Sequence, residues 1–258
     1  MVNQMIAVSR QYQEVGQRLI EKLADGEFSV GERLPSERVI ADEMGVSRAV
    51  IREAMIMLEL FGLVEVKKGS GIYLVSLPEA SQKYILEKDG RYHGEHVGPF
   101  EMLQARQVIE SRVAELAAML VTKNDILKLR HALAQEKMEV ETGKDDVEGD
   151  RLFHRYIAEA TQNSVLIEII EGMWASRQSS PMWQKLHQRI GDKGYQGEWY
   201  DDHAKILMKL QQKDSKGAGH AMWVHLENVK NRLMELSDVE DPNFDGFIFN
   251  VAPSVDAD

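Results

Sequence analysis

Between residues 34 and 60 the apolar positions follow the period of an α-helix in two runs that flank a single glycine. The longer run predicts a helix whose buried stripe recurs at i, i+3, i+4 and i+7. That stripe comprises Ile51, Ala54, Met55 and Leu58. The shorter run predicts a helix with an apolar face of Val39, Ile40 and Met44. Gly45 stands between the runs, where a helix end often takes the left-handed conformation. The pattern therefore predicts two helices joined by a tight turn.

The polar residues around these runs are typical of a DNA-reading helix pair. Ser36 and Ser47 stand where a serine hydroxyl can accept a free backbone N–H and cap each helix. Arg48 and Arg52 are predicted to lie away from the apolar stripe, near the start of the second helix. A helix-turn-helix needs such a cationic helix start, which can enter the major groove. The alternative is an ordinary helical hairpin with two solvated arginines.

Directly after these helices the period changes from helical to alternating. Gly62 ends the second helix, and residues 63–67 and 72–75 then alternate as strands around the turn sequence at 68–71. A helix-turn-helix followed by a β-hairpin is a winged helix. Its wing tip would carry Lys67, Lys68 and the Gly69 backbone, which can reach phosphates or the minor groove.

An earlier helical run completes this first domain. It comprises Tyr12, Val15, Gly16, Leu19 and Leu23, and Gly26 ends it. We therefore expect a winged helix-turn-helix DNA-binding domain over residues 9–76. Residues 77–98 combine Pro78 and several glycines with polar residues. We interpret them as a linker that has room for one short helix around 84–86.

From residue 99 onward the pattern is helical almost throughout, with no convincing strand. Pro99 suits a first helical turn, and helices are predicted over about 99–121, 122–143, 147–162, 165–177, a short stretch from 181, 198–212 and 215–236. Brief connections between such helices make an antiparallel bundle over 99–236, followed by an irregular tail at 237–258. The predicted fold class is mainly α, with an N-terminal winged helix-turn-helix and a C-terminal α-helical bundle.

Composition and charge narrow the function classes. The 258 residues include no cysteine, which excludes disulfides and thiolate metal sites. No apolar run approaches a membrane span and the N-terminus has no signal-peptide pattern, so a cytoplasmic protein is expected. The net charge of −11 argues against indiscriminate nucleic-acid binding. Any DNA contact must therefore come from a local cluster, namely Arg38, Arg48, Arg52, Lys67 and Lys68.

Three of the eight histidines lie at positions that are not typical of surface histidines. His203 and His225 each belong to the apolar stripe of their predicted helix, and His154 lies one helical turn after Asp150. One oxygen and three nitrogen donors suit Zn²⁺, with Ni²⁺ and Mn²⁺ as alternatives, and leave coordination positions open. The alternative is a set of core histidines satisfied by hydrogen bonds.

Arginine and tryptophan residues suggest a ligand pocket in the same bundle. Arg106 lies in a helix whose neighbours pack, and an inward arginine can bind a carboxylate with two hydrogen bonds. Its alternative is a structural pair with Glu110, one turn later. Arg177 and Trp183 flank the Pro181 break and can line the same cavity. These three residues, Arg106, Arg177 and Trp183, are the predicted effector-binding set.

Several of these motifs together resemble the GntR family of bacterial transcription factors. They are Leu34-Pro35-Ser36-Glu37-Arg38, Val46-Ser47-Arg48, Arg52-Glu53-Ala54, Gly62-Leu63-Val64 and Lys68-Gly69-Ser70-Gly71. The second domain resembles that of the FadR-type subfamily, the FCD effector domain, through Arg106-x-x-x-Glu110, Asp150-x-x-x-His154, Asn163, His203 and His225. The resemblance covers about residues 10–236.

The resemblance implies specific roles for these residues. It implies a metal site at Asp150, His154, His203 and His225 beneath an effector pocket. It also implies DNA contacts from Arg38, Ser47, Arg48, Arg52 and Gly69. Ala49 departs from the family pattern, in which many members carry a hydroxyl residue, and the resemblance therefore implies no phosphate contact at this position.

Further motifs resemble the hexuronate-utilisation repressors of this subfamily. They are Gly98-Pro99-Phe100-Glu101, the run from Leu103 to Gln107, the run from Ala221 to Asn228, and Phe244-Asp245-Gly246 in the tail. The resemblance implies a homodimer that binds a near-palindromic operator on double-stranded DNA and is released by a sugar acid such as fructuronate, glucuronate or galacturonate. A uronate carboxylate suits Arg106 and the metal.

Two other function classes remain open at this point. A metal with open positions can activate water, as in a metal-dependent enzyme, although the motif HExxH is absent. A regulator that senses the metal or another carboxylate would need no uronate. The winged helix favours a regulator over an enzyme.

Overall fold

The computed structural model describes residues 10–67, 70–78, 97–143, 148–190 and 197–238, and its contacts divide the chain into two units. The first comprises the residues up to 94 together with those from 237 onward, and the second comprises residues 95–236. Each unit has its own hydrophobic core. None of the helices in the described ranges combines the length and the apolar character needed to cross a lipid bilayer.

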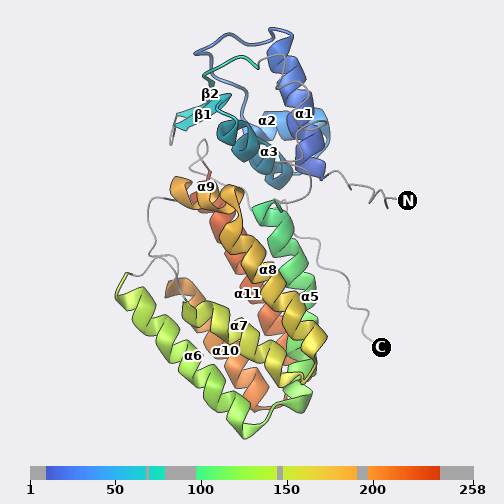
Figure 1. The fold of residues 1–258 in the computed structure, drawn as a ribbon, viewed down its shortest axis with the longest axis vertical. Helices are drawn as coiled ribbons and strands as arrows, with labels where there is room; N and C mark the ends of the chain where they lie inside the picture. The colour runs from blue at the N-terminus through green and yellow to red at the C-terminus, as the bar shows by residue number, and fades with distance from the viewer. Residues whose placement is uncertain (1–9, 68–69, 79–96, 144–147, 191–196, 239–258) are drawn as a thin grey trace, which may run out of the picture. The chain divides into compact units, whose positions relative to one another are not determined.

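The described part of the first unit consists of three helices and a β-hairpin (Figure 1). In chain order they are α1 (Gln11–Ala24), α2 (Glu37–Met44), α3 (Arg48–Leu60), β1 (Val64–Lys67) and β2 (Gly71–Leu74). Helix α3 packs against α1, α2 and the hairpin. Ile51, Ala54, Met55 and Leu58, the predicted stripe, have no exposed surface and form the centre of this core.

The turn between α2 and α3 forms as the sequence predicts. The Ser36 hydroxyl accepts from the Val39 backbone N–H at 3.2 Å, and the Ser47 hydroxyl accepts from the Val50 N–H at 3.4 Å. Gly45 ends α2 with a φ of 66°, a conformation that costs a residue with a side chain more than it costs glycine. The prediction for Val39 is wrong, because this side chain is 46% exposed. Helix α2 has only two turns, and it buries Ile40 and Ala41 instead.

The predicted hairpin also forms, although β1 begins one residue later than predicted and β2 is shifted by one residue towards the N-terminus. Strands β1 and β2 are antiparallel, and Val64 lies opposite Leu74 while Val66 lies opposite Ile72. Residues 31–34 add backbone hydrogen bonds to the other edge of β2. The predicted wing tip at residues 68 and 69 lies outside the described residues, as do most of the predicted linker and the tail motif.

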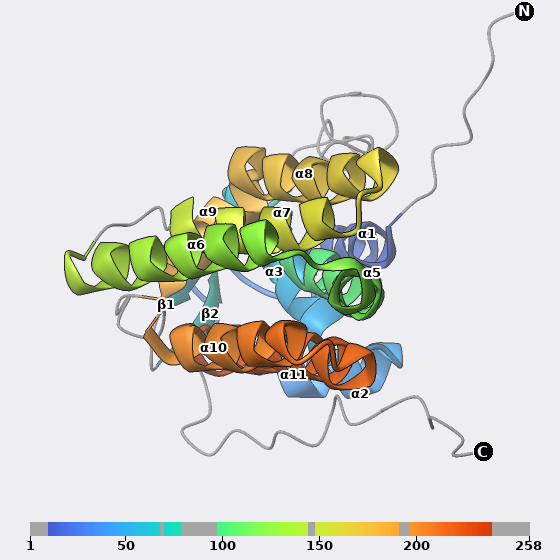
Figure 2. The same ribbon diagram turned by 90° about the horizontal axis from the view of Figure 1, so that it is seen from below.

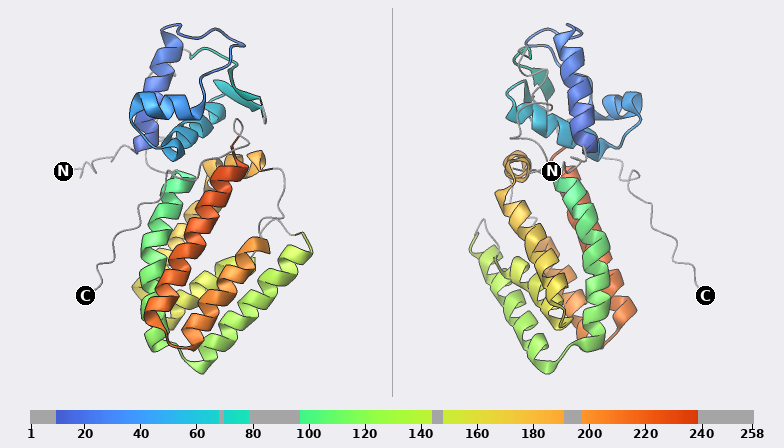
Figure 3. Two further views of the ribbon diagram at one scale, coloured as in Figure 1. Left: turned by 180° about the vertical axis from the view of Figure 1, so that it is seen from behind. Right: turned by 45° about the vertical axis from the view of Figure 1, so that its right-hand side comes forward.

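The second unit is a helical bundle whose helices lie in successive layers (Figures 2 and 3). The helices are α5 (Pro99–Leu120), α6 (Lys123–Glu141), α7 (Glu148–Ala160), α8 (Ser164–Ser179), α9 (Pro181–Arg189), α10 (Gly197–Gln211) and α11 (Ser215–Leu236). Helix α5 packs along α11, while α7 packs between α6 and α8. Every helix predicted in this region is present, and the fold class predicted from the sequence is confirmed.

One glycine allows α6 and α7 to approach each other unusually closely. A Cβ atom added at Gly149 in α7 would lie 2.3 Å from the backbone nitrogen of Glu136 and 2.8 Å from the carbonyl oxygen of Ala132, both in α6. Backbone atoms cannot move aside as a side chain can. Because Asp150 follows Gly149 directly, this close approach also fixes the position of a predicted metal ligand relative to α6.

We therefore expect Gly149→Ala to force α6 and α7 apart and to destabilise the second unit by about 1–3 kcal/mol, as overpacking does in other cores. The matched control is Gly172→Ala in α8, where no atom lies within 4 Å of an added Cβ. The control should be neutral or more stable by about 0.5–1 kcal/mol, since alanine favours helix. Urea unfolding measures both changes, and a Gly149→Ala variant as stable as the original protein would contradict the close approach.

Candidate functional site

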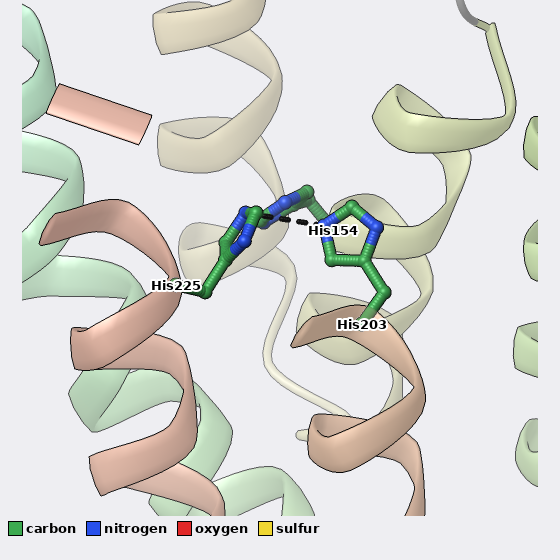
Figure 4. A group of neighbouring side chains, drawn as sticks. All are labelled: His154, His203 and His225. Atoms are coloured by element: carbon green, nitrogen blue, oxygen red, sulfur yellow. Dashed lines mark hydrogen bonds between the residues drawn. The ribbon is translucent and has the colours of Figure 1, made fainter. Parts of the chain in front are cut away.

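Three histidines from three different helices meet inside the second unit (Figure 4). They are His154 on α7, His203 on α10 and His225 on α11, and none is more than 2% exposed. One ring nitrogen from each lies within 4.8 Å of the others. The Nε2 atoms of His203 and His225 are 3.1 Å apart, as the dashed line in Figure 4 marks.

In two of these rings, a carboxylate from a neighbouring helix contacts the Nδ1 atom, on the side of the ring away from Nε2. Glu136 on α6 lies 2.8 Å from His203 Nδ1 through its Oε2 atom. Glu110 on α5 makes a hydrogen bond with His154 Nδ1. Both carboxylates are at most 2% exposed. A carboxylate at Nδ1 favours a proton on that nitrogen, so in the neutral form of each ring the Nε2 atom is the acceptor. Despite burial, Glu110 and Asp150 raise the pKa of His154, and loss of the Nε2 proton must accompany binding of a metal there.

The third ring has a looser arrangement of the same kind. Asp202 Oδ2 lies 3.9 Å from His225 Nδ1, which is too long for a hydrogen bond but close enough for electrostatic attraction. In a neutral His203 with its proton on Nδ1, the Nε2 atom is an acceptor. The 3.1 Å contact then needs either a proton on His225 Nε2 or a cation between the two nitrogens.

Asp150, the fourth predicted ligand, borders the same point. Its Oδ1 atom lies 3.4 Å from His154 Nε2 and 3.8 Å from His203 Nε2, and its side chain is buried. His154 Nε2 is buried without a hydrogen-bond partner in the part of the chain that the structure describes. One carboxylate and three imidazole nitrogens thus converge on one point, and this donor set fits a divalent transition metal.

The electrostatics of the cluster favour ionised carboxylates. Burial alone would raise the pKa of Glu110, but Arg106 and His154 lower it to about 2. His154 similarly keeps the pKa of Asp150 below its usual range despite burial. Burial and the neighbouring His203 lower the pKa of His225 to about 3. A neutral His225 has a free lone pair, which is the form that binds a metal.

Arg106 lies beside the metal cluster and keeps part of its hydrogen-bonding capacity unused. This α5 side chain is 3% exposed, and its Nε donates to Glu110 Oε1 at 2.5 Å. Its Nη2 atom is buried and has no hydrogen-bond partner among the described residues. The guanidinium carbon lies 4.5 Å from the ring centre of Trp174. Because a guanidinium is permanently cationic, the free N–H groups favour an anionic acceptor.

The other two predicted effector residues border the same pocket. The Arg177 guanidinium carbon lies 4.6 Å from the ring centre of Trp174 and 4.7 Å from that of Trp183. Its Nη1 atom is 3.7 Å from Asp150 Oδ2. The pocket is lined by Arg106, Asp150, Arg177, Trp183, Trp199, His225 and Val229. All three predicted effector residues and two of the four predicted metal ligands, Asp150 and His225, therefore line one pocket.

Of the residues predicted to contact DNA, those that the structure describes lie on α2, at the cap of α3 and on α3 itself. Arg38 is exposed on α2, and Ser47 caps α3. Lys68 and Gly69 lie outside the described residues. The structure thus provides an exposed arginine and a capped helix start at the predicted surface.

Arg48 and Arg52, which were predicted to lie away from the apolar stripe, are both buried against polar partners in the described structure. Arg52 has no exposed surface, because its guanidinium donates to Glu37 Oε2 and to the Ser237 hydroxyl. Arg48 is 7% exposed and pairs with Asp238. The spacing of α3 gave no sign of these acceptors, because they come from distant parts of the sequence.

Sequence reasoning also missed the carboxylates that hold the histidines. Glu136 continues the apolar stripe of Leu129, Ala132 and Leu133 at helical spacing, and an acid on such a stripe is a signal that could have been used. Asp202 sits one turn after Trp199 on the inward side of α10. Trp174, which stacks on both arginines, showed no signal beyond an apolar position.

Comparison with known proteins agrees with this architecture. Residues 11–74 match the family described as "Bacterial regulatory proteins, gntR family", and residues 101–228 match the FCD domain. The chain is 48% identical to the Uxu operon regulator of Haemophilus influenzae, over 96% of this chain and 91% of that protein. It is 45% identical to the Uxu operon transcriptional regulator of Escherichia coli K12, over 96% of each chain. It is 47% identical to the Exu regulon transcriptional regulator of the same strain, over 96% of this chain and 95% of that protein.

These relatives are transcription regulators, and they match the chain over both units. Sequence identities of 45–48% over nearly the whole chain establish a shared fold and family. The regulator interpretation is thereby confirmed against the metal-dependent enzyme. The chain belongs to the GntR family of bacterial regulatory proteins and carries an FCD domain after its winged helix.

Proposed function

We propose that this regulator is a homodimeric repressor of hexuronate-utilisation genes that a sugar acid releases from its operator. The observation that carries the effector class is the unpaired Nη2 of Arg106, in one pocket with Asp150 and His225 of the histidine cluster. A uronate offers a carboxylate for the guanidinium and hydroxyls for the remaining polar groups. The Uxu and Exu regulators to which the chain is similar support this class of gene.

We further propose a divalent metal, with Zn²⁺ first and Ni²⁺ or Mn²⁺ as alternatives, held by Asp150, His154, His203 and His225. Three protein nitrogens and one oxygen leave coordination positions that a ligand carboxylate or hydroxyl can fill. When bound, the metal supplies a Lewis acid for those groups. Arg106 and Arg177 orient the ligand carboxylate, while Trp183 and Trp199 form apolar walls of the pocket.

DNA reading is assigned to the start of α3 and the wing. Arg38, Ser47, Arg48, Arg52, Lys68 and Gly69 form the proposed contact set. A dimer would place two such heads on a near-palindromic operator, with dimer symmetry setting the spacing of the half-sites. Arg48 and Arg52 are buried, so DNA binding requires each to exchange a protein acceptor for a base edge or a phosphate: Asp238 for Arg48, and Glu37 or Ser237 for Arg52.

Arg48→Ala is expected to weaken operator binding by about 1–3 kcal/mol, the usual contribution of a bidentate base contact. Fluorescence anisotropy with labelled operator DNA measures the change. Arg18→Ala, which removes the same charge from an exposed position on α1, is the matched control and should bind as the original protein does. Equal affinities for both variants would rule out base reading by Arg48.

Metal content tests the histidine cluster. Protein loaded with Zn²⁺ and dialysed should retain one ion per chain, and His203→Ala should retain almost none because a nitrogen ligand is lost. His220→Ala, at an exposed position on α11, controls for loss of a histidine as such. Elemental analysis gives the ratios. A wild-type chain that keeps no metal would remove the metal from the proposal.

Release of operator DNA by a uronate tests the proposed function as a whole. Anisotropy with DNA upstream of uronate catabolic genes should fall when one of fructuronate, glucuronate or galacturonate is added. Arg106→Gln should weaken this response by about 1.5–3 kcal/mol, the range for hydrogen bonds to charged groups. Arg112→Gln, an exposed arginine on the same helix, is the control.

The results distinguish three hypotheses about the effector. A response to one uronate that needs Arg106 supports the proposal. Operator binding that no uronate changes contradicts the effector class. Release by Zn²⁺ alone would favour a metal-sensing regulator in place of a sugar-acid sensor.

A further inference from the structure

Glu110 connects Arg106 of the pocket to His154 of the metal cluster, with a different carboxylate oxygen on each. Its Oε1 atom accepts from Arg106 Nε at 2.5 Å, and its Oε2 atom accepts from His154 Nδ1. The side chain is 2% exposed, so water does not compete for either oxygen. One carboxylate thus contacts both Arg106, to which we assign the uronate carboxylate, and His154, to which we assign the metal.

Two further carboxylates that face the Nδ1 side of a histidine, Glu136 and Asp202, are arranged differently. Glu136 contacts His203 through both oxygens, and the structure gives no arginine contact for it among the described residues. Asp202 accepts from Lys205 and Asn228 at the edge of the site and lies 3.9 Å from His225. Glu136 is therefore a natural control for Glu110, because it also holds a histidine but has no link to Arg106.

A shared carboxylate makes its two partners dependent on each other. A metal at His154 Nε2 would draw electron density from the ring, and the Nδ1–H group would then bind Glu110 more strongly. Glu110 moves as one rigid group, so a change in its hold on His154 alters its hold on Arg106. Such a coupling acts equally in both directions, because binding free energies are linked.

We propose that Glu110 is a positioning residue that couples the metal site to Arg106, so that the metal and the carboxylate ligand do not bind independently. The ligand half of this statement rests on the proposed function. The competing view treats Glu110 as two separate contacts, a structural ion pair with Arg106 and an orienting hydrogen bond to His154. In that case, changes at Arg106 and Glu110 would affect metal binding independently of each other.

A double-mutant cycle that uses Zn²⁺ alone tests the coupling without any organic ligand. Zn²⁺ affinity of the full chain is measured by competition with a chromophoric chelator for wild type, Arg106→Gln, Glu110→Gln and the double variant. If the two residues are coupled, the loss of Zn²⁺ affinity in the double variant should differ from the product of the two single losses. We expect a difference of about 5-fold or more, the lower end of common coupling strengths. Purely electrostatic action of two separate charges on the metal would leave the effects multiplicative.

The control cycle replaces Glu110→Gln by Glu136→Gln. Glu136→Gln should weaken Zn²⁺ binding, but its effect should combine with that of Arg106→Gln to within about 2-fold, as for independent sites. Equal departures in the two cycles would overturn the proposal, because they would reflect a general response of the cluster. A multiplicative Glu110 cycle would overturn it as well.

Calorimetry with a uronate at saturating Zn²⁺ tests the ligand half. At saturating Zn²⁺, Glu110→Gln should lower uronate affinity by a larger factor than Glu136→Gln, because only Glu110 also holds Arg106. Equal uronate affinities for the two variants would overturn the ligand half. If no uronate binds wild type, the proposed function fails, and the Zn²⁺ cycle still decides the coupling.

A second substitution covers the case in which Glu110→Gln does not fold. Glu110→Asp keeps the charge but is shorter by one methylene, so it cannot span both donors. It should reproduce the non-multiplicative result with Arg106→Gln, while circular dichroism confirms the helical fold. A Glu110→Asp variant that behaves as wild type in both Zn²⁺ and uronate binding would overturn the requirement for a spanning carboxylate.

Discussion

The second unit depends on one constraint, namely that polar groups buried in a helical bundle must find partners there. An unpaired buried charge costs far more than a buried pair, so the helices that carry such groups are held in fixed register. Glu110, Glu136 and Asp150 each face a histidine on their own or a neighbouring helix. The cluster therefore links α5, α6, α7 and α10 through contacts that a shift of one helical turn would break.

The close approach at Gly149 serves the same constraint. Glu136 can reach His203 on α10 only if α6 lies near the centre of the bundle, and a side chain at residue 149 would push α6 away. The backbone N–H of Gly149 also donates to Glu139, which ties the start of α7 to α6. Packing and hydrogen bonding thus fix the same pair of helices, and the position of Asp150 follows from both.

Features that depend on neighbouring residues, such as helix caps, could be predicted from the sequence. Contacts between residues far apart in the chain could not. The caps Ser36 and Ser47 and the left-handed Gly45 follow from neighbours three or four positions away, and each was predictable. The inward His203 and His225 follow from helical period. The partners of Arg52 could not be predicted in this way, because Glu37 and Ser237 are separated from it by 15 and 185 positions in the chain. Helical period assigns a residue to a face, but it does not say which residues cover that face.

Charge balance gives an order to the proposed binding events. Glu110, Glu136, Asp150 and Asp202 place four carboxylates around the histidines, whereas Arg106 and Arg177 supply two guanidinium groups near them. A ligand carboxylate that entered this site without a metal would approach Asp150 directly, and like charges repel strongly where water is scarce. A divalent cation bound beside Asp150 makes the electrostatic potential there attractive to a carboxylate. On the proposed function, the metal is therefore bound before the sugar acid, and the pocket recognises the acid only as part of a site that already holds the metal.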